Sequence, residues 1–104
     1  MISATQEQLY AIAFRAIEAQ EAKNDAVHAK NIYHSAWQCY EVGAENFEPG
    51  EKYYVHPEER ISSHHPDFDA AKEATKQWYV AYKNAKRAEY NAKRRLETAI
   101  RAIS

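Results

Sequence analysis

The residues that break helices are confined to one stretch in the middle of the chain. Both glycines and all three prolines lie between Gly43 and Pro66, and neither flank contains one. Because proline and glycine interrupt helices, long flanks without them favour continuous helical structure. We therefore predict an all-α single domain over residues 1–104, folded as a long antiparallel helical hairpin. The first arm covers residues 5–41, an irregular packed connector covers 42–65, and the second arm covers 66–102.

The second arm carries an alanine stripe, a row of small residues at alternating steps of three and four. This spacing places every member on one side of a helix, and small side chains let a second helix approach closely. We predict that the stripe is the contact between the two arms. Its members are Ala71, Ala74, Trp78, Ala81, Ala85, Ala88, Ala92, Arg95, Ala99 and Ala102.

The first arm repeats this spacing over most of its length, in Ala19, Ala22, Ala26, Ala29, Tyr33, Ala36 and Tyr40. Nearer the N-terminus the apolar residues shift to another row, formed by Tyr10, Ala13, Phe14 and Ile17. The shift lies close to residues 23–25, which include poor helix formers. A kink there, or two helices in place of one, is the alternative to a continuous arm.

Folding the arms together brings large side chains opposite small ones. We expect Tyr33 and Tyr40 to lie over Ala71 and Ala74, and Trp78 to face Ala29 or Ala36.

Local signals place the start of the first arm and a turn in the connector. Thr5 with Gln8 three residues later predicts a capping box, with Ser3 and Gln6 as the alternative pair. Proline followed by glycine in residues 48–51 predicts a type II turn. On either side of this turn, Phe47 and residues 53–55 could pair as a short β-hairpin.

The apolar content suggests that a lone hairpin has a thin core. Large aliphatic residues are scarce and the mean hydropathy is -0.80. Pairing two hairpins into a four-helix bundle would bury the apolar residues beside the stripes, so we expect a homodimer. These flanking residues are Leu9, Ile12, Ile17, Tyr82, Leu96 and Ile103.

Other features bear on where the protein resides. The single cysteine, Cys39, excludes an internal disulfide and favours a reducing compartment. We also find no run of about 20 apolar residues and no signal-peptide pattern. We expect a cytoplasmic protein with no membrane partner.

No motif indicates catalysis, a metal or a cofactor. His64 and His65 are adjacent, and His28 and His34 are six residues apart, so neither pair has the spacing of a helical zinc site. Paired carboxylates such as Glu58 and Glu59 come without any sign of a cleft that would separate their pKa values. We therefore expect a protein that is not an enzyme and has no cofactor.

Charge is distributed unevenly along the chain. The formal net charge is -1, yet residues 72–101 contain nine basic and three acidic side chains. Basic residues alternate with tyrosines on the outer rows of the second arm, a pattern that suits phosphates or an acidic protein surface. We predict a partner-binding site at Tyr79, Lys83, Lys86, Arg87, Tyr90, Lys93 and Arg94. Two simpler interpretations are a solvated face with local ion pairs and neutralisation by the acidic remainder of the chain.

These observations favour non-catalytic binding. In size and composition the chain resembles small inhibitor proteins that phages and mobile elements make to block host nucleases or defence complexes. That resemblance implies a host protein or complex with an acidic surface as partner. The alternatives are a nucleic-acid-binding helical protein, which the isoelectric point near 6.5 disfavours, an oligomer that sequesters a phosphate-bearing small ligand, and a purely structural module.

Overall fold

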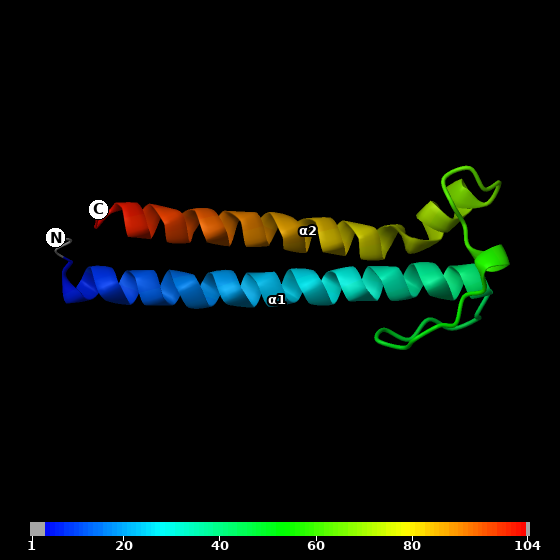
Figure 1. The fold of residues 1–104 in the computed structure, drawn as a ribbon, viewed down its shortest axis with the longest axis horizontal. Helices are drawn as coiled ribbons and strands as arrows, with labels where there is room; N and C mark the ends of the chain where they lie inside the picture. Colours follow the sequence, from blue (N-terminus) through cyan, green and yellow to red (C-terminus); the bar gives the residue numbers. More distant parts are fainter. Residues whose placement is uncertain (1–3, 104) are drawn as a thin grey trace. The chain divides into compact units, whose positions relative to one another are not determined.

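The chain folds as two long helices that pack against each other and are joined by an irregular connector (Figure 1). The computed structural model describes residues 4–103. Helix α1 spans Gln6–Val42, the short 3-10 helix η1 spans Pro57–Glu59, and α2 spans Phe68–Arg101. No residue between positions 4 and 103 belongs to a β-strand. The predicted all-α helical hairpin is confirmed, with helix ends within one or two residues of those expected.

The first arm is a single helix, because residues 23–25 continue α1 without interruption. The alternative of two helices was therefore wrong. At its start, the Thr5 N–H donates to Gln8 Oε1 at 2.8 Å, and the Gln8 N–H donates to Thr5 Oγ1 at 3.1 Å. This reciprocal capping box confirms the predicted pair. The alternative pair includes Ser3, which lies outside the described residues.

A glycine terminates α1 because it adopts a left-handed conformation. Gly43 has φ +70°, a region that is costly for residues with a Cβ. Its N–H donates to the Tyr40 carbonyl, and the Ala44 N–H donates to the Cys39 carbonyl, each at 3.1 Å. These two bonds form a Schellman motif, which satisfies carbonyl groups at the end of the helix.

The described chain divides into two compact units, and each contains part of both helices. Unit 1 combines α1 up to Val27 with α2 from Asn84 onward. Unit 2 comprises His28–Lys83 and therefore includes the whole connector.

The interface of α2 is rotated from the predicted alanine stripe. Every second member of that stripe is exposed, namely Ala74, Ala81, Ala88, Arg95 and Ala102. In the row that is buried or half-buried, each of these exposed residues is replaced by the residue that follows it in the sequence. The members of this row are Phe68, Ala71, Thr75, Trp78, Tyr82, Ala85, Glu89, Ala92, Leu96, Ala99 and Ile103. Both rows share every seventh residue. The larger side chains at the alternate positions bury more surface than alanine, and this decides which row faces α1.

The interface of α1 keeps one heptad row throughout. The predicted row from Ala19 to Tyr40 is confirmed, since all its members are buried or half-buried. It continues toward the N-terminus through Arg15, Ile12 and Gln8. The expected shift to another row was wrong, because Tyr10, Ala13, Phe14 and Ile17 are all exposed.

The connector packs on both helices of unit 2, as predicted. The Ser35 hydroxyl donates to the Glu51 carbonyl at 2.7 Å, and the Phe47 ring lies 5.2 Å from the Trp78 ring. Cys39 is buried, with its thiol 3.8 Å from the Ala44 carbonyl oxygen. The cysteine thus occupies a small buried position near the end of α1.

The type II turn is confirmed, but the β-hairpin around it was wrong. The Glu51 N–H donates to the Glu48 carbonyl at 3.1 Å, and Gly50 has φ +92°. Where a strand partner was expected, the Tyr53 hydroxyl accepts from the Glu48 N–H at 3.1 Å and donates to the Asn46 carbonyl at 3.4 Å. A side chain therefore satisfies the backbone groups that a β-ladder would have used.

The predicted pairing of aromatic residues with alanines was partly wrong. Ala74 is exposed and does not lie beneath Tyr33. The Tyr33 ring instead lies 5.4 Å from Tyr79 and 6.2 Å from Tyr82. Aromatic pairs at such distances attract each other in addition to burying area, so this part of the hairpin is held by ring contacts.

Candidate binding surfaces

All seven residues of the predicted partner site lie on α2, and all are exposed. Unit 1 contains five of them, which we call the basic face: Lys86, Arg87, Tyr90, Lys93 and Arg94. The other two, Tyr79 and Lys83, belong to unit 2. The members of the basic face follow one another at helical spacing on the side of α2 away from its interface row.

Tyr90 and Arg94 form an ordered pair on the basic face. Arg94 Nη1 donates to the Tyr90 hydroxyl at 3.2 Å, and the guanidinium carbon lies 5.8 Å from the ring centroid. The hydrogen bond to Tyr90 raises the pKa of Arg94 above its already high ordinary value. The Tyr90 side chain is 59% exposed, so the pair presents an aromatic ring and a permanent positive charge to solvent.

Local ion pairs also form along α2, as the simpler interpretation predicted. Lys93 Nζ lies 3.2 Å from Glu89 Oε2, and Arg101 Nη2 lies 3.8 Å from Glu97 Oε2. Exposed pairs of this kind contribute only a few tenths of a kcal/mol, roughly 0.3–0.5. These two pairs therefore contribute little to the stability of α2.

In unit 2, Tyr79 belongs to an aromatic cluster. Its ring contacts Tyr33, and the Lys83 ammonium lies 5.6 Å from its centroid. Burial, and secondarily Tyr79, raises the pKa of the Tyr33 hydroxyl. Tyr33 consequently remains neutral and able to donate a hydrogen bond at physiological pH.

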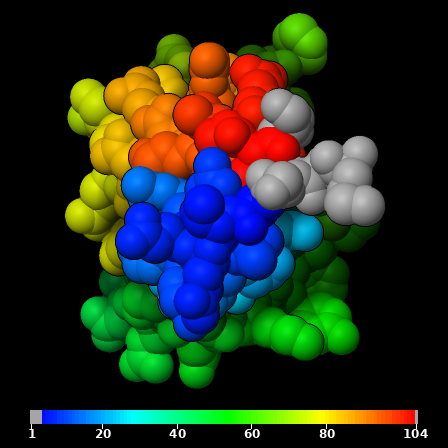
Figure 2. Space-filling view, turned by 90° about the vertical axis from the view of Figure 1, so that its left-hand side faces the viewer, coloured from blue at the N-terminus to red at the C-terminus, as the bar shows by residue number. Residues whose placement is uncertain are grey.

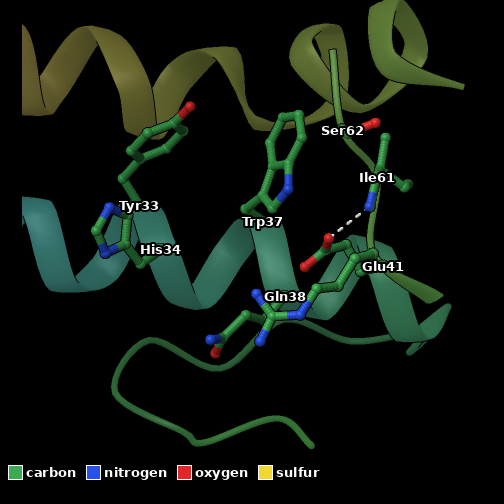
Figure 3. A pocket seen from close by; sticks show the side chains of 8 residues that line it. Tyr33, His34, Trp37, Gln38, Glu41, Ile61 and Ser62 are labelled. Carbon is green, nitrogen blue, oxygen red and sulfur yellow. Dashed lines mark hydrogen bonds between the residues drawn. The ribbon is translucent and has the colours of Figure 1, made fainter. Parts of the chain in front are cut away.

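The connector and α1 line a largely open cavity of about 480 Å³ in unit 2. In Figure 3, Tyr33 and Trp37 extend from α1 toward α2, whereas Gln38 extends toward the connector. The Glu41 carboxylate at the end of this cavity accepts the Ile61 N–H at 2.7 Å. This hydrogen bond joins the connector to α1.

A larger cavity of about 660 Å³ lies between α1 and α2 in the same unit. Two aromatic residues of α1, Tyr33 and Trp37, line one side. Residues of α2 line the rest: Phe68, Asp69, Lys72, Glu73, Thr75, Lys76 and Tyr79. The Trp37 and Phe68 rings meet edge to face at 5.8 Å, and the Lys72 ammonium lies 5.5 Å from the Phe68 centroid.

Of the residues that line this cavity, only Tyr79 was predicted from the sequence to belong to a binding site. The missing signal was in α1, where Trp37 directly follows the interface residue Ala36. A large aromatic side chain next to an interface row can lie along the groove between the two helices, as Trp37 does. The heptad assignment of both helices is needed to see that Trp37 and Lys72 border the same groove.

The described residues contain no group of three or more His, Cys, Asp or Glu side chains placed to hold a metal ion. None of the helices in residues 4–103 is long and apolar enough to cross a membrane. Comparison with protein-family models, curated proteins and solved structures gave no match.

Proposed function

We propose that this protein is a non-catalytic binding protein whose basic face contacts an acidic surface of a partner protein. The observation that carries the proposal is the Tyr90–Arg94 pair, held in place and exposed among further basic residues. Tyrosine and arginine dominate the energetics of protein interfaces, because they bury much area while keeping hydrogen-bonding groups. A pair ordered before binding also loses less side-chain entropy on association.

A protein partner is favoured over nucleic acid by the charge of the whole chain. The formal net charge is -1, and the acidic excess outside residues 72–101 would repel a polyanion that extends beyond the basic face. A compact acidic patch on a protein can contact the basic face alone. Inhibition of a host nuclease or defence complex by a phage-type protein is one form of this proposal, and it implies that binding suppresses the partner's activity.

The test compares charge reversal on the basic face with an equal charge change elsewhere. The test variant is Arg87→Glu with Arg94→Glu, and the control is Lys23→Glu with Lys52→Glu, which are also exposed. Proteins captured from the host by the natural chain would be purified, and their affinity for all three chains measured by calorimetry. We expect the test variant to bind at least about 30-fold more weakly, the effect of losing one hot spot, and the control to bind nearly normally.

Three outcomes contradict the proposal. Equal losses in both variants would mean that overall charge drives binding. Full binding by the test variant would show that the basic face is not the contact. Tight, salt-sensitive binding of labelled single-stranded or duplex DNA at two salt concentrations would favour the nucleic-acid alternative.

A further inference from the structure

We propose that the cavity between α1 and α2 in unit 2 is a separate site for a small planar aromatic anion, with a nucleoside phosphate as the ligand class. This site does not depend on the basic face of unit 1. Its volume of about 660 Å³ falls in the range of small-ligand sites, roughly 300–1,000 Å³.

Aromatic rings from both helices line the cavity. Tyr33 and Trp37 belong to α1, while Phe68 and Tyr79 belong to α2. All four side chains are only partly covered by the protein itself. Partly exposed rings at a cavity wall can stack on a flat heterocycle, and one such contact is worth about 1–3 kcal/mol where bases stack on proteins.

Basic and acidic side chains of α2 alternate beside the rings. The Lys72 ammonium lies over the Phe68 ring, 5.5 Å from its centroid, and Lys76 lines the cavity one turn further along α2. Asp69 and Glu73 also line the cavity, so the formal charges of its lining sum to zero. A nucleoside phosphate suits this mixed lining, because its phosphate can contact Lys72 and Lys76 while its ribose hydroxyls donate to Asp69 and Glu73.

Tryptophan fluorescence gives a direct test, because the chain has only two tryptophans. Trp37 lines the cavity, whereas Trp78 packs against Phe47 of the connector. The Trp78→Phe variant therefore leaves one tryptophan, positioned to report ligand binding. Circular dichroism checks that the variant folds, and a ligand-induced rise in the melting temperature of the natural chain provides a second measurement.

The ligands are adenosine monophosphate, adenosine, ribose 5-phosphate and inorganic phosphate. We expect saturable quenching of Trp37 by the nucleotide, with affinity about tenfold or more above that of each fragment. Lys72→Gln with Lys76→Gln should weaken nucleotide binding by about tenfold or more. The matched control, Lys86→Gln with Lys93→Gln on the basic face, should leave nucleotide binding unchanged.

The proposal is overturned if the nucleotide neither quenches Trp37 nor raises the melting temperature. Equal affinity for adenosine and the nucleotide would also overturn it, because the lysines would then play no part. Affinity that rises steeply with the length of an oligonucleotide would assign the groove to single-stranded nucleic acid instead. None of these results bears on the basic face, whose test uses residues outside the cavity.

Discussion

At the scale of single residues, the interface of unit 1 tolerates polar side chains because they find partners across it or along it. Arg95 Nε donates to Glu18 Oε1 at 2.7 Å and so joins α2 to α1. Arg15, at a heptad interface position, lies 3.3 Å from the same carboxylate. Its aliphatic stem can cover apolar surface while its guanidinium remains with Glu18. The Glu18 carboxylate thus forms ion pairs with two arginines.

This arrangement makes part of the stability depend on pH. The hydrogen bond from Arg95 is the main reason why the pKa of Glu18 is lowered in the folded chain. A carboxyl whose pKa is depressed by folding stabilises the fold above its unfolded pKa, near 4.3, and this contribution is lost as the pH falls through the lowered folded value.

We predict that Glu18→Gln lowers the melting temperature more at pH 7 than at about pH 3, because protonation of the natural Glu18 as the pH falls removes its contribution. Thermal unfolding followed by circular dichroism at both pH values measures the two differences. Glu97→Gln is the matched control, because Glu97 pairs only within α2, with Arg101 at 3.8 Å. An equal decrease at both pH values would show that the ion pair is not the source of the effect.

At the scale of elements, the two helices contact each other through heptad rows whose smallest members are the most buried. Ala92 is 1% exposed, whereas Ala88, one turn earlier in the predicted alanine stripe, is exposed. Both residues lie in α2 and in unit 1. They differ in packing and not in their suitability for a helix, so they allow a controlled comparison.

We predict that Ala92→Leu destabilises the protein by about 1–3 kcal/mol, because the added carbons have no space at a close helix contact. Ala88→Leu should change the free energy of unfolding by no more than about 0.5 kcal/mol. Urea unfolding of both variants provides the comparison. If the two variants lost equal stability, the interface would instead follow the predicted stripe.

The register of α2 shows where sequence reasoning reached its limit. Alternating steps of three and four residues fit two neighbouring rows of α2, which share Ala71, Ala85 and Ala92. The predicted row was chosen because it contains more alanines, and it is not the row that faces α1. Glu89 at a half-buried interface position concealed the correct row, since a charged residue there argues against burial in the sequence alone. In α1, Arg15 concealed the continuing heptad in the same way.

The positions of the two helices and the exposure of the basic face could be predicted from local sequence patterns. Proline and glycine positions located the connector, and Thr5 with Gln8 located the start of α1. The cavity of unit 2 could not be predicted, because it requires Trp37 and Phe68 to meet across the hairpin. Which turn of α1 lies opposite which turn of α2 in this unit depends on contacts such as Tyr33 with Tyr79, and no single helix encodes that alignment.

At the scale of the whole molecule, the chain leaves large apolar side chains uncovered at the start of α1. Leu9, Tyr10, Phe14 and Ile17 are 54–66% exposed. Figure 2 shows the first turns of α1, in blue, facing outward from unit 1 beside the last turns of α2, in red. Contiguous apolar side chains of this size typically mark association surfaces in soluble proteins. The homodimer expected from the sequence remains a prediction, and these residues are where it can be tested.

We predict that the natural chain associates as its concentration rises and that Phe14→Gln with Ile17→Gln abolishes this association. Because both side chains are exposed, the double variant should match the stability of the natural chain at low concentration to within about 0.5 kcal/mol. Sedimentation velocity over a range of concentrations measures association, and melting temperatures at low concentration measure the fold. A natural chain that stays monomeric throughout would rule out the dimer. A variant that unfolds much more easily at low concentration would instead show that these residues support the hairpin itself.

The natural chain should also melt at higher temperatures as its concentration increases, because association stabilises the folded state by mass action, and this dependence should disappear in the variant.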